Sequence, residues 1–296
     1  MRVVAVIPAW NARSRLDDVL DALDGQVEHV VVVDNLSSDG TAAWLSTARA
    51  NVACLESGDN IGYAAAVNRA IEHARRWSPD AVLLVNDDAV FGPGAVALLS
   101  AALERDATIG AASAHMVYAD DEGTLNGAGG TFDRERGWAA LRGAGTPDDG
   151  RFTGSPDVEY PSGAASLLRS AALDDVGGMD EAYYLYFEDA DWGLRAAELG
   201  WRTIYVPEAR VVHVGSAGTA DDPARRRYYN VRNRLRLARR HASRSGRALA
   251  WAETIGLLAK QPPRWISPAR RRDAEAVFLG VLDHLRGRYG RSARFG

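Results

Sequence analysis

A pair of adjacent carboxylates follows an aliphatic segment in the first third of the chain. Residues 81–85 are all aliphatic, and Asn86, Asp87 and Asp88 come directly after them. Carboxylates are the hard oxygen ligands that Mg²⁺ and Mn²⁺ prefer. A divalent cation bridging a nucleotide diphosphate there would offset the charge that develops on a leaving phosphate. Asn and Asp also favour turns and helix caps, so the motif alone leaves a structural role open.

A second acidic cluster follows an aromatic segment. Residues 183–187 read Tyr-Tyr-Leu-Tyr-Phe, and Glu188, Asp189 and Asp191 come next, at the start of an expected helix. Apolar surroundings raise the pKa of a carboxyl group towards the range of a general base, whereas a helix N-terminus lowers it. The structural alternative is that these acids complement the helix dipole and that Asp191 pairs with Arg195 four residues later.

One histidine stands in a sequence context that permits ligation. His213 lies in the short apolar segment 211–214, after Pro207. Such a histidine is either a hydrogen-bonded core residue or a metal ligand. We interpret the remaining histidines as structural or surface residues: His29, His73, His115, His241 and His284.

The elements that must position these groups alternate in type over the first hundred residues. Continuous apolar runs are typical of strands buried on both faces of a parallel sheet. Strands are predicted over 3–7, 29–33, 52–55 and 81–85, with helices over 14–23, 41–49 and 62–77. The alternation predicts an α/β fold with helices on both faces of the sheet. Ligands of such sheets bind beyond the carboxyl ends of the strands, where this chain has polar loops. Those loops are residues 8–11, 34–35 and 86–88.

The second half of the chain is less regular. Residues 120–161 are rich in Gly, Asp and Thr and are expected to form loops, short strands and a flap. The later elements follow from hydrophobic pattern and from Gly and Pro stops. They are a strand at 163–168, a helix at 188–199 stopped by Gly200, a strand at 203–206 ended by Pro207, a strand at 211–214, and basic helices from Pro223 onward.

Charge is segregated along the chain. The net charge is −4, but residues 223–296 hold 19 basic and 4 acidic residues, which leaves 16 basic and 35 acidic residues elsewhere. An acidic body with a basic tail suggests a polyanionic or membrane-surface partner. Cys54 is the single cysteine, and the sequence contains no apolar run long enough to span a bilayer. We therefore expect a cytoplasmic protein without internal disulfides.

Several enzyme classes with similar sheets lack support in the sequence. A Rossmann dehydrogenase needs Gly-x-Gly-x-x-Gly after the first strand, and a nucleotidylyltransferase needs a glycine-rich basic loop there, but residues 8–11 are Pro-Ala-Trp-Asn. A haloacid-dehalogenase-type phosphatase needs a second Asp two residues after Asp34, where Leu36 stands. Nucleic-acid binding would use the basic tail but not the two acidic clusters, so no nucleic-acid partner is expected.

The motifs, taken together and in order, resemble the family 2 glycosyltransferases, most of all the bacterial rhamnosyltransferase-like branch. The resemblance extends from residue 3 to about residue 235. The motifs are Pro8-Ala9-Trp10-Asn11, residues 31–40 around Asp34-Asn35, Asn60-Ile61-Gly62-Tyr63 with Asn68, Asn86-Asp87-Asp88, residues 178–181, residues 186–191, Arg195, Gly200, residues 207–209 and His213.

The resemblance implies a GT-A fold, with a Rossmann-like, mostly parallel central sheet flanked by helices and a basic helical C-terminal extension. Residues 1–222 would form the catalytic domain, with a nucleotide-sugar-binding part at 1–118 and an acceptor part at 119–222, and residues 223–296 would form the extension. It further implies inverting transfer of rhamnose or a hexose from a dTDP- or UDP-linked donor, with Mg²⁺ or Mn²⁺ as cofactor.

Site residues carry over by position from the resemblance. The donor would be bound by Pro8, Ala9, Asn11, Asp34, Asn35, Asn60, Gly62, Asn68, Asn86 and Asp87. In this set Asp34 would bind the base, and Asn60 with Gly62 would form the floor under base and ribose. Residues 86–88 match the family's DXD metal motif, with Asn in its first position; Asp88 and His213 would be the metal ligands.

The second acidic cluster matches the family's ED motif, which makes Asp189 the catalytic base. Gly163, Glu188, Asp191 and Arg232 would contact the acceptor or sugar. Arg232 belongs to an arginine-rich segment, residues 225–235. For most arginines of this segment, a solvated helix face is an equally good interpretation. The resemblance leaves three classes of acceptor open: a glycan, a polyprenyl-diphosphate-linked sugar and a small molecule.

The end of the chain predicts two amphipathic basic helices, at 248–258 and 274–285. Such helices lie on an anionic membrane, pack on the body or form a homodimer interface. Membrane contact would place the protein at the inner face of the membrane. The alternative to an enzyme is a non-catalytic nucleotide-sugar-binding or scaffold protein with the same fold.

Overall fold

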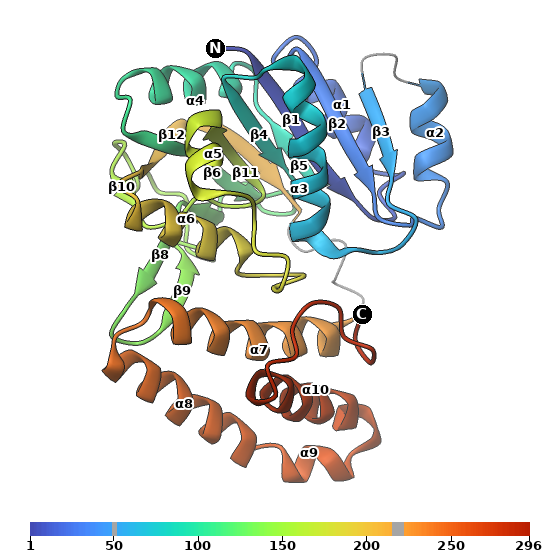
Figure 1. The fold of residues 1–296 in the computed structure, drawn as a ribbon, viewed down its shortest axis with the longest axis vertical. Helices are drawn as coiled ribbons and strands as arrows, with labels where there is room; N and C mark the ends of the chain where they lie inside the picture. The colour runs from blue at the N-terminus through green and yellow to red at the C-terminus, as the bar shows by residue number, and fades with distance from the viewer. Residues whose placement is uncertain (49–51, 215–221) are drawn as a thin grey trace.

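The computed structural model describes residues 1–48, 52–214 and 222–296. Its first half alternates strands and helices as the apolar runs predict (Figure 1). The elements are β1 (Val3–Ala9), α1 (Leu16–Leu23), β2 (His29–Asp34), α2 (Thr41–Ala48), β3 (Val52–Glu56), α3 (Gly62–Ala74), the 3₁₀ turn η1 (Arg75–Trp77) and β4 (Ala81–Val85). These strands pair in parallel in the order β4-β1-β2-β3. Their carboxyl ends therefore meet at one edge of the sheet.

The rest of the sheet is mixed rather than parallel throughout. The strands of this part and the helices between them are β5 (Ala89–Phe91), α4 (Ala95–Glu104), β6 (Ile109–Tyr118), β7 (Leu125–Ala128), β10 (Asp157–Val158), β11 (Ala165–Arg169), α5 (Ser170–Val176), α6 (Glu188–Glu198) and β12 (Arg202–His213). The strand order continues β10-β12-β6-β11-β4, and β11 runs antiparallel to both β6 and β4. The α/β prediction is confirmed, but this antiparallel strand makes the sheet less parallel than expected.

One predicted strand boundary is wrong. Pro207 was expected to end a strand, yet β12 continues through it to His213. Pairing of β12 with β6 shifts register between Val206 and Arg210, which face the adjacent residues Ala114 and His115. A proline is tolerated inside a strand at such a bulge, because no ladder hydrogen bond is required of its nitrogen there.

Helices cover both faces of the sheet, as predicted. Alternate residues of β1 point to opposite sides: Val3, Ala5 and Ile7 pack with α1 and α4, whereas Val4 and Val6 pack with α3, α5 and α6. The all-apolar sequence of β1 is explained by these two cores, since a strand between two helical layers has no solvent face.

Residues 120–161 contain short strands, as expected. Besides β7 and β10 they form a separate hairpin of β8 (Gly130–Asp133) and β9 (Trp138–Leu141), which extends from the sheet towards the C-terminal helices (Figure 1). Phe132 of this hairpin packs with Leu237 and Ala238 of the C-terminal region. The hairpin thus forms part of the contact between the catalytic body and the chain end.

The C-terminal region is helical, as predicted. It consists of α7 (Pro223–His241), α8 (Arg244–Ala259), α9 (Pro262–Ile266) and α10 (Pro268–Leu285). Helix α7 lies against the body, while α8, α9 and α10 form the outer layer (Figure 1). Within the described residues, no helix is long and apolar enough to cross a bilayer.

Candidate active site

A cavity of about 290 Å³ opens where the carboxyl ends of β1 and β4 meet the start of α6. Most of the residues predicted for the site line it. These are Pro8, Ala9, Asn35, Asn60, Gly62, Asn86, Asp87, Asp88, Gly163, Glu188, Asp189 and His213. The predicted residues that do not line it are Asn11, Asp34, Asn68, Asp191 and Arg232.

Strand pairing brings together the two groups predicted as metal ligands. The antiparallel pairing of β5 with β12 sets His213 opposite Ala89, the residue that follows Asp88. As a result His213 Nε2 lies 3.0 Å from Asp88 Oδ1. Both side chains are almost fully buried at the cavity wall. Sequence motifs 125 residues apart thus form one cluster.

Hydrogen bonds assign the form of the His213 ring. The amide nitrogen of Asn86 lies 3.3 Å from His213 Nε2, and Asn126 Oδ1 lies 3.1 Å from Nδ1. An amide nitrogen only donates and an amide oxygen only accepts, so Nδ1 carries the proton and Nε2 presents its lone pair. That lone pair faces the Asp88 carboxylate 3.0 Å away, and an imidazole nitrogen beside a carboxylate oxygen is a suitable pair of ligands for a divalent cation.

This pair fits a divalent cation that completes its coordination from outside the protein. The described residues contain no group of three or more His, Cys, Asp or Glu side chains that would enclose a metal. Mg²⁺ in phosphate-transfer sites is usually held by one or two carboxylates together with substrate phosphates and water. Asp88 and His213 match that incomplete donor set better than they match a closed structural site.

Asp87 is engaged by the protein itself. Its carboxylate accepts hydrogen bonds from the Arg15 guanidinium at 2.9 Å and from the Trp10 backbone nitrogen at 3.2 Å. Burial raises the pKa of Asp87 to about 6, and the Arg15 charge opposes that rise. Because Arg15 also donates to the carbonyl oxygens of Trp10 and Asn11, Asp87 fixes the loop after β1 in place.

The loop before α3 forms one wall of the cavity. Asn35 donates to the carbonyl oxygen of Gly62 at 3.4 Å and accepts from the Ile61 nitrogen at 3.3 Å. Gly62 has a φ of +84°, and a Cβ there would lie 2.4 Å from the Tyr184 ring. Tyr184 in turn donates to Asn60 Oδ1 at 2.9 Å. Only glycine permits this close approach of the loop to Tyr184.

Two of the predicted donor residues shape loops behind the cavity instead of lining it. Asn11, at a φ of +50°, accepts at Oδ1 from the Ser38 nitrogen at 2.8 Å, which joins the loop after β1 to the loop after β2. Asp34 accepts from the Ser37 nitrogen at 3.1 Å, while its other buried oxygen has no hydrogen-bond partner among the described residues. That second oxygen is available to a ligand that reaches it.

The segment before α6 has an unusual backbone. Tyr184, Tyr186 and Phe187 have φ values of +67°, +69° and +73°, a region that side chains of this size rarely adopt. Each such residue costs about 1–3 kcal/mol and persists only where the surroundings hold it. Here the amide nitrogen of Asn233, on α7, lies 2.9, 2.7 and 3.1 Å from the carbonyl oxygens of Tyr183, Leu185 and Tyr186.

Arg232, predicted to contact the acceptor, lies behind this same segment. Its guanidinium is buried and donates to the carbonyl oxygens of Tyr183 at 3.0 Å and Gly290 at 2.7 Å. Its role in the structure is thus to hold the chain that precedes α6.

Within the arginine-rich segment 225–235, the residue that lines the cavity is Arg225 and not Arg232. Arg225 was not among the residues predicted for the site. It lies in the first turn of α7, is almost fully buried, and stacks over the Trp10 ring at 5.1 Å. Helical geometry explains the difference. Arg225 and Arg232 are seven residues apart, so they share a face but stand about 10.5 Å apart along the axis. A guanidinium at the cavity suits recognition of a diphosphate.

Asp189 has the surroundings of a general base. Its Oδ2 accepts from the Gly163 nitrogen at 2.9 Å and its Oδ1 from the Ala190 nitrogen at 2.7 Å, which fix its orientation. Burial raises the pKa of Asp189 above its usual range, and those two backbone hydrogen bonds oppose the rise. Gly163 is held in turn by the Tyr63 hydroxyl, which donates to its carbonyl oxygen at 2.6 Å.

Glu188 is a second carboxyl group with an altered acidity. Burial, followed by the neighbouring charge of Asp189, raises the pKa of Glu188 to about 8. Its Oε2 is buried and has no hydrogen-bond partner among the described residues. Glu188 therefore holds its proton more tightly than an ordinary carboxyl group, and it has an unsatisfied polar atom at the cavity wall.

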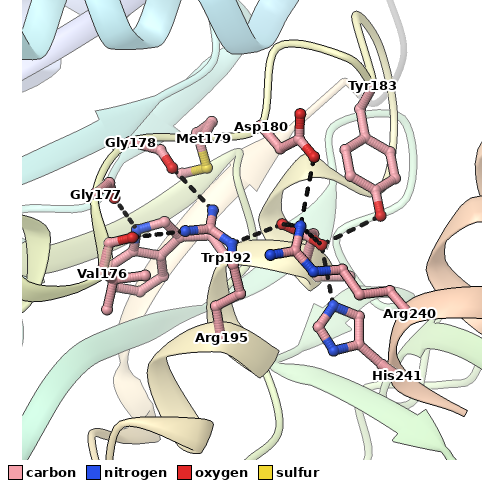
Figure 2. A network of polar contacts seen from close by, with 12 residues as sticks. Val176, Gly177, Gly178, Met179, Asp180, Tyr183, Trp192, Arg195, Arg240 and His241 are labelled. Carbon is pink, nitrogen blue, oxygen red and sulfur yellow. Dashed lines mark hydrogen bonds and ion pairs between the residues drawn. The ribbon is translucent and has the colours of Figure 1, made fainter. Parts of the chain in front are cut away.

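Asp191 does not line the cavity, and its buried carboxylate belongs to a polar network with Arg195, Arg240 and His241, which Figure 2 shows. Its carboxylate pairs with Arg195 at 2.8 Å, with His241 at 3.0 Å and with Arg240 at 3.2 Å. Burial raises the pKa of Asp191, but hydrogen bonds from His241 and Arg195 outweigh it and hold that pKa below its ordinary value. The Arg195 pairing predicted as the structural alternative is present. The network joins α6 to the end of α7.

Asn68 is likewise structural. Its amide accepts from the Met179 nitrogen at 2.8 Å and donates to the Met179 carbonyl oxygen at 2.9 Å. This pair of bonds ties α3 to the loop before α6, so Asn68 positions that loop without lining the cavity.

Substitution of Asn233 tests how much the strained segment matters. In Asn233→Ala the three carbonyl oxygens lose their shared donor, and the backbone before α6 relaxes. Displacement of a catalytic group by about 1 Å costs roughly 10²-fold in rate, so kcat should fall by about that factor. Asn230→Ala, on the same helix, is the matched control. Steady-state kinetics of both variants decide: equal kcat values would contradict the positioning role.

Comparisons with known proteins agree with this geometry. The family model for glycosyltransferase like family 2 matches residues 2–240. The chain is 33% identical over 217 residues to an N-acetylglucosaminyl-diphospho-decaprenol L-rhamnosyltransferase of Mycobacterium tuberculosis, which covers 66% of this chain and 69% of that protein.

Two solved structures share the fold at low sequence identity. One is the mannosyltransferase PcManGT from Pyrobaculum calidifontis in complex with GDP-Man and Mn²⁺, with a TM-score of 0.59 and 19% identity over 96% of this chain and 87% of that chain. The other is S. aureus TarS 1–349 in complex with UDP, with a TM-score of 0.57 and 16% identity over 98% of this chain and 93% of that one. The chain belongs to the family 2 glycosyltransferases and is a glycosyltransferase with a GT-A fold.

Proposed function

We propose that this enzyme is a metal-dependent, inverting glycosyltransferase that moves rhamnose or a hexose from a dTDP- or UDP-linked donor to an acceptor hydroxyl. The observation that carries the proposal is the placement of three groups on one cavity: the Asp88–His213 pair, the buried carboxylate of Asp189 and the buried carboxyl group of Glu188. In this proposal residues 1–222 are the catalytic domain and residues 223–296 support it.

The residues of the chain divide the work of an in-line displacement. Asp189 takes the proton from the acceptor hydroxyl, and that oxygen attacks the anomeric carbon on the side opposite the diphosphate, which inverts the configuration. Protonated Glu188 donates a hydrogen bond to a sugar or acceptor hydroxyl. Arg225 binds the diphosphate. Asp88 and His213 would hold Mg²⁺ or Mn²⁺, which offsets the charge on the leaving group.

The donor contacts proposed for the remaining residues follow the walls of the cavity. Pro8, Ala9, Asn35, Asn60 and Gly62 would enclose the base and ribose. Asp34 would reach the base with its unsatisfied oxygen, and Asn86 would contact the ribose or phosphate with the Oδ1 that has no partner among the described residues.

The rhamnosyltransferase relative supports a choice of substrates. We propose dTDP-rhamnose as the first donor to test and a polyprenyl-diphosphate-linked sugar as the first acceptor, ahead of a free glycan or a small molecule. An acceptor anchored in a bilayer requires the enzyme to work at the membrane surface. The non-catalytic alternative is not favoured, because two buried carboxyl groups with raised pKa values on the same cavity as the Asp88–His213 pair are more typical of a catalytic site than of a scaffold.

Incubation with donor and acceptor tests the proposed function. We expect release of a nucleoside diphosphate and an extended acceptor of inverted configuration, both abolished by EDTA and restored by Mn²⁺. Nuclear magnetic resonance of the product gives the anomeric configuration. A product that keeps the configuration of the donor would overturn the single-displacement mechanism, and full activity in EDTA would overturn the metal requirement.

The pH dependence of kcat should be bell-shaped. Asp189 acts as a base only when ionised, and its pKa is raised, so activity falls as the pH drops through that pKa. Glu188 is useful while protonated, and its pKa is about 8, so activity also falls as the pH rises past that value. Glu188→Gln keeps an uncharged donor that cannot ionise. The variant should lose the alkaline limb and keep the acid limb in a kcat–pH profile; an unchanged alkaline limb would contradict the assignment.

A further inference from the structure

Exposed apolar side chains lie close together on the short helix α9 and the following helix α10. Trp265 and Ile266 of α9 and Phe278 of α10 have exposed fractions of 39%, 86% and 48%. The Trp265 and Phe278 rings contact each other edge to face at 6.0 Å. These three residues, with Lys260, Arg264, Arg270 and Arg271, form what we call the α9 surface. Ile266 is exposed almost completely, and exposed apolar side chains that are grouped in this way, unlike single ones, are typical of an interaction surface.

The charges around these apolar residues are not neutralised. Lys260, Arg264, Arg270 and Arg271 have no carboxylate partner in the described part of the chain. The acidic residues of this region are engaged elsewhere. Glu253 pairs with Arg234, Asp273 with Arg227, Glu275 with Arg294, and Asp283 accepts from the Tyr228 hydroxyl. The α9 surface therefore presents a net positive charge next to apolar groups.

We propose that the α9 surface docks the enzyme on an anionic lipid bilayer. Phospholipid phosphates would neutralise the four cations, and the interfacial region would take up Ile266, Trp265 and Phe278. Charge argues against a second copy of this chain as the occupant. A two-fold interface brings the same patch against itself, so it would set four unpaired cations against four others.

The position of the surface suits this role. Helices α8, α9 and α10 form the layer farthest from the sheet, and α7 lies between them and the catalytic body (Figure 1). Docking through α9 would therefore not engage the residues that line the cavity, none of which lies on α8, α9 or α10. The inference rests on the proposed function in one respect: a lipid-linked acceptor is the reason why the enzyme would need to dock on a membrane. The charge and exposure of the α9 surface do not depend on the proposed function.

Vesicle co-sedimentation of the full chain tests the proposal. We expect binding to vesicles of phosphatidylcholine with phosphatidylglycerol, little binding to phosphatidylcholine alone, and weaker binding as salt rises. Each cation near an anionic surface contributes about fivefold to affinity, so the double variant Arg270→Gln with Arg271→Gln should bind about 25-fold more weakly. The double variant Ile266→Ser with Phe278→Ser should also bind at least tenfold more weakly, because it removes the inserted apolar area.

Matched variants on the catalytic body are the controls. Leu98→Ser with Leu199→Ser removes two exposed apolar side chains, and Arg76→Gln with Arg105→Gln removes two exposed charges. We expect both to bind like the wild type. Absence of wild-type binding to anionic vesicles would overturn the proposal, as would equal losses in test and control variants. A dimer dissociated by Ile266→Ser, seen by analytical ultracentrifugation, would assign the surface to a second copy instead.

Failure of this inference and failure of the proposed function give different results. Vesicle binding is measured without donor, and nucleotide binding is measured without vesicles. Nucleotide binding with no vesicle binding would reject the α9 surface alone. If vesicle binding is weaker in the test variants than in the wild type, and the protein binds no nucleotide, the result would support the α9 surface and reject the proposed donor site.

Discussion

Asp189→Asn should lower kcat by about 10³-fold while leaving nucleotide binding nearly unchanged. A positioned general base contributes typically 10²–10⁴-fold, and Asn cannot accept the acceptor proton at any accessible pH. The fold should tolerate the change. Asn has the same shape, and its oxygen can still accept one of the two hydrogen bonds that the Gly163 and Ala190 nitrogens donate to Asp189.

Two measurements separate loss of the base from loss of the site. Steady-state kinetics give kcat, and titration calorimetry gives the affinity for the nucleoside diphosphate. Asp174→Asn, an exposed carboxylate on α5, is the matched control and should behave like the wild type. An Asp189→Asn enzyme with kcat within tenfold of the wild type would remove Asp189 as the base.

Asp88→Ala should abolish the effect of metal on donor binding and lower kcat/KM by roughly 10³-fold. The metal's stabilisation of a leaving phosphate is worth several kcal/mol, and about 4 kcal/mol corresponds to that factor. His213 alone would not retain a hard cation, because the Asp88 carboxylate 3.0 Å away supplies the negative charge of the pair. The measurement is donor affinity with increasing Mn²⁺, for wild type and variant.

A milder variant tests the orientation of His213 separately. Asn126→Ala removes the acceptor for the Nδ1 proton at 3.1 Å, so the ring loses its fixed tautomer. Such outer partners typically affect metal affinity by 10–100-fold. Asn126→Ala should therefore need more Mn²⁺ but reach activity near that of the wild type at saturation.

For the Asp88→Ala variant, a dependence of donor affinity on Mn²⁺ identical to that of the wild type would rule out this metal site.

The parallel strands of the first half of the chain could be predicted because their hydrophobic pattern is unambiguous. The apolar runs of β1, β2 and β4 have no polar alternation, and this feature alone implies strands covered on both faces. The direction of β11 could not be read in this way, because an apolar run is the same in parallel and antiparallel pairing. Strand β12 passes Pro207 only because β6 supplies a partner for the bulge, a tertiary effect absent from local sequence.

The two acidic clusters were predictable from the sequence, but the assignment of Asp191 to the cavity was wrong because Asp191 lies on another face of its helix. Asp191 follows Asp189 by two residues, which on a helix is a rotation of about 200°, so both cannot point into one cavity. The pairing with Arg195, four residues on, already indicated the other face. Arg225 and the donor Asn233 could not be predicted as site residues, since nothing local shows that α7 begins at the cavity and crosses the segment before α6.

Titration calorimetry of the wild-type enzyme with dTDP, UDP, GDP and ADP, each with and without Mn²⁺, tests the central claim most directly. The proposed site predicts that dTDP or UDP binds, at least tenfold more tightly with Mn²⁺, and that the purine nucleotides bind more weakly. No binding of any nucleoside diphosphate at millimolar concentration, or binding of dTDP and UDP that is unaffected by Mn²⁺, would contradict a metal-dependent nucleotide-sugar site at Asp88 and His213.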